Sequence, residues 1–177
     1  MKKYGIAIPL SGKVLSLAKK KQKKIYAAMS IKSSWIYGAD PHINLISGRT
    51  ENIENIICSI NKFRYKKNKY CEYLGLGILI TPEPLIYMRF TNSEFLRDLR
   101  LYLFNETLPL WDNLTNTVRN NMWIPKSTLA YKDFSMNDLS KIMLLLNEKS
   151  FKLKMEIKEL SVINFTKQEY EVERINI

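Results

Sequence analysis

The chain has 177 residues, of which 46% are hydrophobic and 25% are charged, and its 28 lysines and arginines against 17 acidic residues give a formal net charge of +11. This length and composition exclude a disordered chain and predict one globular domain spanning residues 1–177. The basic excess favours an anionic partner, although abundant Lys, Asn and Ile throughout the chain fit a codon bias equally well.

The chain contains one histidine and two cysteines, Cys58 and Cys71. These are too few for a standard zinc site, so we expect no metal and no other cofactor. Two separated cysteines do not indicate a disulfide framework, and a reduced, cytoplasmic setting fits best. No long uncharged apolar stretch occurs, so we expect no membrane-spanning helix and no membrane partner.

The apolar periodicity of the first half predicts alternating strands and helices. In chain order these are a strand over Tyr4–Leu10, a helix over Lys13–Met29, a strand beginning at His42, a helix over Glu51–Tyr65, and strands over Tyr73–Ile80 and Leu85–Phe90. The last two strands are joined by a turn that contains two prolines.

The second half continues in the same way. Its predicted elements are a helix over Glu94–Phe104 capped by Asn92 or Ser93, a strand beginning at Lys126, a helix from Asn137 to about Asn147, a strand over Phe151–Ile157 and a terminal strand over Glu169–Ile177. This mixture of strands and helices predicts an α+β fold.

Two short segments, Pro41–Leu45 and Pro125–Leu129, have the same layout. Each runs from a proline through a charged or ionisable residue, a variable residue and a small polar residue to a leucine. Side chains alternate between the two faces of a strand, so His42 shares a face with Asn44, and Lys126 shares a face with Thr128. If the two strands lie side by side, an imidazole, an amide, an ammonium and a hydroxyl meet in one cleft, and such a group suits a phosphate.

The two segments lie 84 positions apart, and each follows a strand and a helix. We interpret this as a weak internal duplication. It predicts a bilobal, pseudo-symmetric molecule in which two antiparallel sheets face a central cleft and the helices lie outside.

With these segments in place, the chain resembles the 2H phosphoesterase superfamily, the 2′-5′ RNA ligase-like proteins. Members of this superfamily have two pseudo-symmetric lobes, each of which supplies one His-x-Thr/Ser-hydrophobic motif to a central cleft. The resemblance covers most of the chain and includes the opening strand Tyr4–Leu10, Trp35 ahead of the first motif, and Trp123-Ile124-Pro125 leading into the second.

The resemblance implies roles for four residues. His42 matches the first motif histidine, and Thr128 matches the second motif Thr/Ser, so these two are the candidate catalytic residues. Asn44 stands where the first Thr/Ser is expected, and Lys126 stands where the second histidine is expected. In the superfamily one histidine is thought to act as base and the other as acid, so this pair is incomplete here.

Six further residues are candidate ligand contacts because they flank the motifs, open the first strand or lie on a neighbouring strand: Trp35, Tyr37, Trp123, Tyr131, Tyr4 and Arg89. The aromatic ones among them can stack on bases, and packing in the core or at its rim is the alternative for each.

Three interpretations of function remain open. In the first, a 2H-like protein binds a nucleotide, a cyclic oligonucleotide or an RNA end, and its phosphodiesterase activity is impaired because Lys126 replaces a histidine; a sponge or sensor for a signalling nucleotide is one form of this. In the second, an active phosphodiesterase uses His42 as its acid-base group and Lys126 as an electrostatic aid. In the third, the fold serves only protein interaction.

Overall fold

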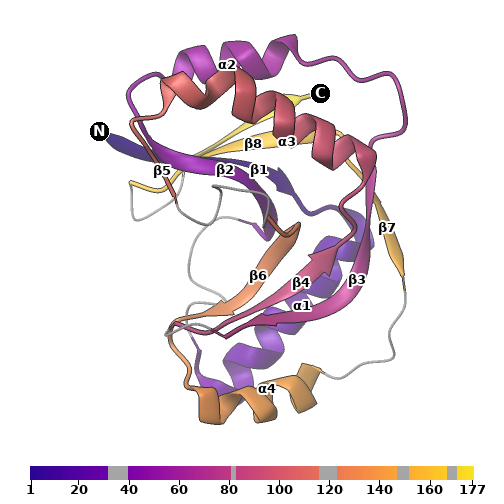
Figure 1. Ribbon diagram of the computed structural model, residues 1–177. Helices are drawn as coiled ribbons and strands as arrows, with labels where there is room; N and C mark the ends of the chain where they lie inside the picture. Colours follow the sequence, from indigo (N-terminus) through magenta and orange to yellow (C-terminus); the bar gives the residue numbers. More distant parts are fainter. Residues whose placement is uncertain (32–39, 81–82, 116–122, 147–151, 167–170) are drawn as a thin grey trace.

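The computed structural model describes residues 1–31, 40–80, 83–115, 123–146, 152–166 and 171–177 (Figure 1). Its helices are α1 (Gly12–Met29), α2 (Ile53–Lys62), α3 (Glu94–Thr107) and α4 (Leu139–Leu146), with short 3-10 turns at Leu108–Leu110 and Met136–Asp138. Its strands are β1 (Lys2–Pro9), β2 (His42–Thr50), β3 (Tyr70–Leu79), β4 (Leu85–Phe90), β5 (Asn113–Leu114), β6 (Lys126–Tyr131), β7 (Leu153–Glu156), β8 (Glu159–Asn164) and β9 (Glu171–Asn176).

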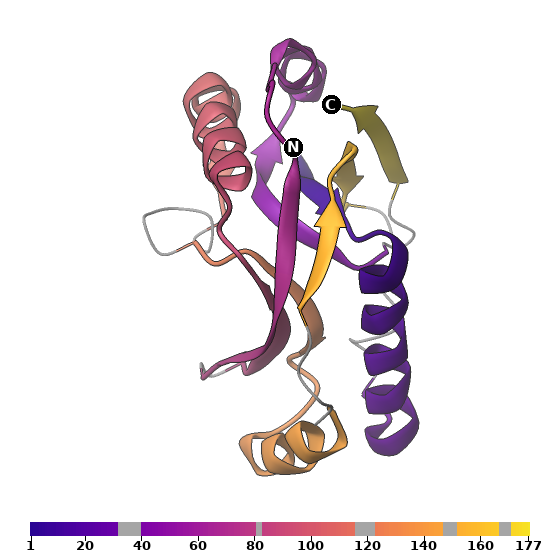
Figure 2. The ribbon, with the colours of Figure 1, turned by 90° about the vertical axis from the view of Figure 1, so that its right-hand side faces the viewer.

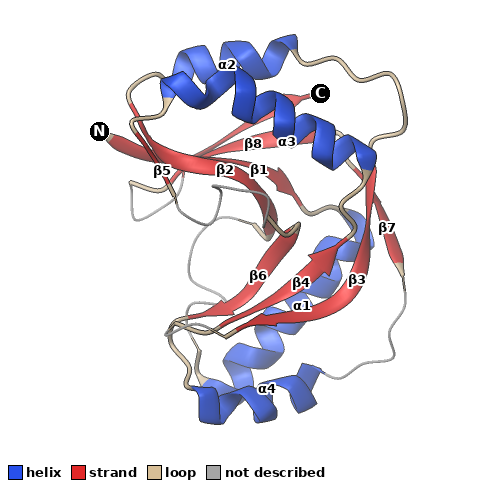
Figure 3. Cartoon of the chain, viewed as in Figure 1, coloured by secondary structure: helices blue, strands red, loops and turns tan. Residues whose placement is uncertain are grey.

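The strands form two antiparallel sheets, one in the order β5-β2-β1-β8-β9 and the other in the order β6-β4-β3-β7 (Figure 3). Helices α2 and α3 lie on the outer side of the first sheet, and α1 and α4 lie on the outer side of the second (Figure 2). The predicted α+β class, with two antiparallel sheets and helices outside, is therefore confirmed. No described helix combines the length and the apolar character that crossing a bilayer requires.

The helices are exchanged between the sheets. Helix α1 follows β1 of the first sheet but packs against β6 and β7 of the second. Helix α3 follows β4 of the second sheet but packs against β2 of the first. The duplication alone suggests that each lobe is one half of the chain. The structure differs, because each sheet is covered by a helix that follows a strand of the other sheet.

Most predicted elements are present within a few residues of their expected bounds, and the Ser93 hydroxyl caps α3 by accepting from the Leu96 N–H at 3.3 Å. Two strands were not predicted. The chain passes from β7 in one sheet to β8 in the other through only Ile157 and Lys158. Because this connection does not reverse the chain within one sheet, it needs no turn with Gly or Pro. The sequence therefore contains no turn residue that marks where β7 ends and β8 begins. Strand β5 has only two residues, too few to show a period.

The duplication is visible in the strand register. Between the pairs Ala7–Asn44 and Ile6–Ile46, β2 contains one extra residue, Leu45. Between the pairs Tyr87–Thr128 and Ile86–Ala130, β6 contains one extra residue, Leu129. Each motif strand thus carries a bulge at the leucine of its motif, and a bulge of this kind bends the strand and increases its twist. Both leucines are fully buried.

Gly77 lies where the second sheet leaves no space for a larger side chain. A Cβ at Gly77 would overlap the ring of Tyr87, which is itself buried on the neighbouring strand. We expect Gly77→Ala to lower the free energy of unfolding by about 1–3 kcal/mol, measured by urea denaturation. In the double variant Gly77→Ala/Tyr87→Ala the overlap is removed, so its cost should be smaller than the sum of the two single costs; strict additivity would contradict this packing.

Candidate functional site

The two motif strands begin in the same way. Pro41 precedes β2, and its carbonyl accepts a hydrogen bond from the Leu10 N–H at 2.8 Å. Pro125 precedes β6, and its carbonyl accepts from the Phe90 N–H at 2.9 Å. Each proline therefore fastens the start of its motif strand to the neighbouring strand's end, at β1 in one sheet and at β4 in the other.

Burial alternates along both motifs as predicted. On β2, His42 and Asn44 are half-buried, whereas Ile43 is completely buried. On β6, Lys126 and Thr128 are half-buried, and Ser127 is completely buried. The polar pair of each motif accordingly lies on the opposite face of its strand from the residue between them.

Strands β2 and β6 lie side by side although they belong to different sheets (Figure 1). His42 and Lys126 are the first residues of these strands, and the positive charge of Lys126 reaches His42 strongly enough to lower the pKa of its imidazole. The structure therefore brings the two residues that the sequence singled out into one electrostatic environment.

The environment of His42 favours a neutral ring. Burial lowers the pKa of the imidazole, the hydrogen bond to the Asp40 carbonyl raises it, and the charge of Lys126 lowers it further. His42 Nδ1 lies 2.8 Å from the Asp40 carbonyl oxygen, which can only accept. The proton of the neutral ring is therefore assigned to Nδ1, and Nε2 keeps a lone pair, as a general base or a hydrogen-bond acceptor requires.

Lys126 is a half-buried cation. Burial lowers the pKa of its ammonium, and its Nζ lies 5.9 Å from the centre of the Tyr87 ring. Arg89 is its direct partner across the β4–β6 pair and is exposed. Within the described parts of the chain, neither cation forms an ion pair with a carboxylate. Two like charges at opposed positions are unfavourable, and an anion bound there relieves this repulsion.

Trp123 joins the two motif strands. Its indole Nε1–H donates to the Asn44 carbonyl at 3.0 Å, and the Arg100 guanidinium lies 5.0 Å from the centre of the indole ring. Because Trp123 comes just before β6 and Asn44 lies on β2, this bond links the two strands across the boundary between the sheets. The structure thus supports packing, the alternative interpretation of Trp123, while its role as a base-stacking residue stays a prediction.

The side chain of Asn44 faces β1. Its Nδ2 donates to Ser47 Oγ at 3.1 Å, and its Oδ1 is buried without a hydrogen-bond partner in the described part of the molecule, near the position that a Gly5 Cβ would occupy. Turning the amide over would let Oδ1 accept from the Ser47 hydroxyl and would put an N–H donor in the unsatisfied position.

Two of the other candidate residues lie away from this group. Tyr4 pairs with Gly48 and packs against the hydrophobic core, on the face of β1 opposite to Ala7 and therefore opposite to Asn44. Tyr131 is the last residue of β6 and donates from its hydroxyl to Glu83 at 2.6 Å. Trp35 and Tyr37 lie outside the described residues.

Sequence reasoning missed two residues that contact the motifs. Asp40 orients His42 through its carbonyl, and Gln22 of α1 donates from Nε2 to the Thr128 carbonyl at 3.4 Å. A backbone acceptor leaves no trace in residue type, so Asp40 had no signal beyond its position before Pro41. The sequence contains no signal for Gln22 either, because its partner Thr128 lies 106 positions away.

Known proteins match this chain by structure and not by sequence. No protein-family model matches the sequence, and no curated protein sequence matches it. Among solved structures, TT0787 of Thermus thermophilus is similar, with a TM-score of 0.63, 14% identity, and coverage of 98% of this chain and 97% of that chain. Escherichia coli LigT in apo form has a TM-score of 0.61 and 11% identity, with 99% and 95% covered. A structure described as a phosphoesterase has a TM-score of 0.58 and 11% identity, with 99% and 98% covered.

The chain has the 2H phosphoesterase fold. At identities this low the likeness establishes the fold, and it extends over nearly the whole chain. Within the 2H fold, this chain carries His42-Ile43-Asn44-Leu45 at the start of β2 and Lys126-Ser127-Thr128-Leu129 at the start of β6.

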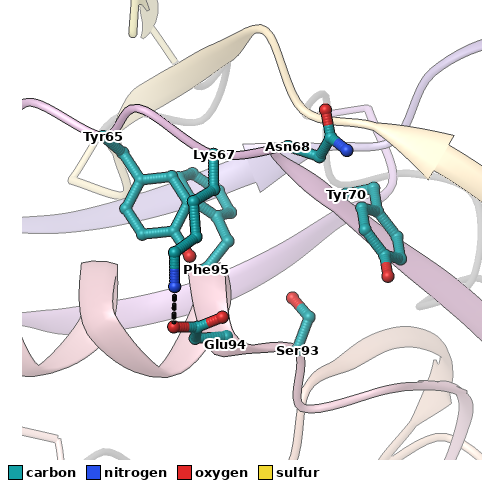
Figure 4. A pocket seen from close by; sticks show the side chains of 7 residues that line it. All are labelled: Tyr65, Lys67, Asn68, Tyr70, Ser93, Glu94 and Phe95. Atoms are coloured by element: carbon teal, nitrogen blue, oxygen red, sulfur yellow. Dashed lines mark hydrogen bonds and ion pairs between the residues drawn. The ribbon is translucent and has the colours of Figure 1, made fainter.

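A separate hollow of about 210 Å³ lies between the loop before β3 and the start of α3, in another part of the 2H fold (Figure 4). Lys67 crosses it to form an ion pair with Glu94 at 2.6 Å. The Glu94 carboxylate opposes an anion there, and it pairs with Lys67, one of the three lysines of the basic loop at residues 66–69. Among the described residues, no three His, Cys, Asp or Glu side chains are grouped as a metal site requires.

The charge coupling between the motifs can be measured on the single histidine. We expect the pKa of His42 to lie below its ordinary value of 6.5 and to rise in Lys126→Met, because that substitution removes a positive charge and keeps an apolar stem. An NMR titration of the imidazole resonances measures both values. Lys154→Met is the control, since Lys154 lies on β7 at the other edge of the second sheet. An equal pKa in Lys126→Met and wild type would show that the two groups do not interact.

The half-buried ammonium also predicts a gain in stability. Lys126→Met should raise the free energy of unfolding by about 1 kcal/mol at pH 7, because burying a charge without a carboxylate partner is costly. For a chain of this length such a gain raises the melting temperature by about 2–4 °C. The folded-state pKa of Lys126 is lowered, so the charged form opposes folding and the gain should shrink as the pH approaches about 10. A melting temperature at or below that of wild type would contradict the cost.

Proposed function

We propose that this protein binds the phosphate of a nucleotide, a cyclic oligonucleotide or an RNA end between His42 and Lys126, and hydrolyses it slowly or not at all. One observation carries the proposal: two sheets bring an imidazole and an ammonium into one electrostatic environment, and no carboxylate among the described residues pairs with that ammonium. In this proposal Lys126 and Arg89 neutralise the phosphate, Thr128 donates to its oxygens, and Asn44 donates with the amide hydrogen that its bond to Ser47 does not use.

Relatives in fold support a nucleotide as the ligand. Escherichia coli LigT has been solved in complex with 3′-AMP, with ATP and with NADP+, and the 3′-AMP complex matches this chain with a TM-score of 0.60 and 12% identity over 99% of its length. A phosphate is common to the three ligands. The phosphate is also the part of a nucleotide that fits the charges around Lys126, so we propose it as the group that this chain recognises.

The chemistry of hydrolysis supports an impaired enzyme. Cleavage of a phosphodiester needs a base for the attacking oxygen and an acid for the leaving oxygen. His42, neutral and with Nε2 unprotonated, supplies the base. Lys126, with a reference pKa of about 10.4, holds its proton far more tightly than a histidine of about 6.5. Losing an acid of suitable pKa typically costs about 100- to 10,000-fold in rate.

An active phosphodiesterase is the second candidate, and one observation favours it. Burial lowers the pKa of Lys126, which makes its ammonium a better proton donor than a lysine in water. In this alternative His42 removes the proton of the attacking hydroxyl, and Lys126 gives a proton to the leaving oxygen. Both candidates use the same residues and differ only in turnover.

Restoring the histidine separates the candidates. We expect wild type to bind 3′-AMP, 2′,3′-cyclic nucleotides or cyclic dinucleotides with little turnover, and Lys126→His to raise turnover of a cyclic or linear phosphodiester by about 100-fold or more. Lys126→Met should weaken binding about 10- to 100-fold, because it removes a charge-assisted hydrogen bond worth about 1.5–3 kcal/mol. Calorimetry measures binding, chromatography of the products measures turnover, and Lys154→Met serves as the control.

Turnover in wild type that is abolished by both His42→Ala and Lys126→Met would establish the active phosphodiesterase instead. Absence of both binding and turnover with every ligand would leave a protein-interaction module and overturn the proposal.

A further inference from the structure

The charge of this chain is concentrated at its N-terminal end. Residues 1–39 contain nine lysines and no acidic residue, whereas the other 138 residues contain 19 basic and 17 acidic residues. The net charge of +11 therefore comes almost entirely from this segment. A uniform codon bias does not produce such an asymmetry, so the location of the charge needs a physical account.

Most of these lysines lie on one helix. The inner side of α1 is buried against the second sheet and α4 through Val14, Leu17, Ala18, Lys21 and Ile25. Its opposite side carries the exposed lysines Lys13, Lys19, Lys20 and Lys23. Helix α1 has no acidic residue, so no carboxylate of the helix itself balances these lysines, and the partner of Lys19 is Asp40, which lies before β2. We call these four residues the lysine face.

The lysine face adjoins the candidate site. Lys19 forms an ion pair with Asp40 at 2.7 Å, and the carbonyl of Asp40 holds His42. One turn later, Gln22 donates to the carbonyl of Thr128 on β6. The helix therefore contacts the Asp40 side chain ahead of the first motif and the Thr128 backbone within the second, and Lys23, the neighbour of Gln22, is exposed.

We propose that the lysine face binds the phosphates of a single-stranded oligonucleotide whose terminal phosphate occupies the site between His42 and Lys126. This inference rests on the proposed function and names its ligand as a chain of several nucleotides, not a free nucleotide. A polynucleotide is the ligand that repeats a negative charge over the length of a helix, and lysines bind such a backbone without reading its sequence.

A membrane surface is a poorer partner for the same charges. A helix that lies on a bilayer inserts an apolar side between the headgroups. The apolar side of α1 is buried inside the protein, and Tyr26 is the one large hydrophobic residue exposed along this helix. Charge without an insertable apolar side favours an extended polyanion in solution.

The test compares ligand lengths in matched variants. Affinities for 3′-AMP and for RNA strands of three and twelve nucleotides are measured by calorimetry or fluorescence anisotropy at several salt concentrations. One variant carries Lys13→Gln, Lys20→Gln and Lys23→Gln, and leaves Lys19 and its Asp40 contact intact. The control carries Lys152→Gln, Lys154→Gln and Lys158→Gln, which removes the same charge from the exposed side of β7 and its ends. Circular dichroism confirms that both remain folded, as the similar helix propensities of Gln and Lys predict.

We expect wild type to bind the twelve-nucleotide strand at least 10-fold more tightly than 3′-AMP. The lysine-face variant should lose that gain and keep its affinity for 3′-AMP, and the control should match wild type. Each phosphate contact to a single strand contributes about 0.7 to the slope of log K against log salt, so losing three lowers the slope by about 2. His42→Ala should weaken both ligands, because one strand spans both surfaces.

The contrary results are distinguishable. If 3′-AMP binds but strand length and the lysine-face variant have no effect, the inference is wrong and the proposed function stands. If the lysine face binds RNA while His42→Ala changes nothing, the strand does not enter the site and the inference is wrong. If vesicles containing anionic lipid bind through the lysine face and RNA does not, the partner is a membrane and the inference is wrong. If 3′-AMP and RNA both fail to bind, the proposed function falls together with the inference.

Discussion

Strands β2 and β6 belong to different sheets but lie against each other at their first residues, and this contact sets the distance between His42 and Lys126. Three features of the chain stabilise it. Each strand is fastened at its start by a proline carbonyl, each bends at a buried leucine bulge, and the Trp123 indole bonds across from one strand to the carbonyl of the other. Because a charge coupling decays with distance, these contacts, by holding the backbone, also hold the coupling between His42 and Lys126.

The same contact explains why this site is electrostatically unusual. A basic group is normally buried with a carboxylate partner, since transferring a lone charge from water is costly. Lys126 is half-buried over an aromatic ring and opposite an arginine, and its desolvation is expressed as a lowered pKa. Sites that hold such unfavourable charge are candidates for binding, because the ligand supplies the missing countercharge.

The sequence predicted those features of the molecule that follow from the regular spacing of residues along the chain. The two-residue alternation of the strands put His42 with Asn44 and Lys126 with Thr128, and the repeat at 84 positions indicated that the two strands are equivalent. It did not predict β8, because a strand that continues into another sheet leaves no turn behind. It also did not separate the two faces of β1, so Tyr4 was assigned to the site although its partly buried side chain packs against the core. Contacts made through backbone carbonyls, such as those of Asp40 and Thr128, have no residue-type signature at all.

The exchange of helices between the sheets affects how the whole chain unfolds. Since α1 covers the second sheet and α3 covers the first, separating the lobes would strip the apolar face from both. Neither lobe can melt on its own and leave the other standing, so unfolding should be a single cooperative event. A chain folded in this way loses the cover of both sheets if its lobes part, so the arrangement opposes their separation.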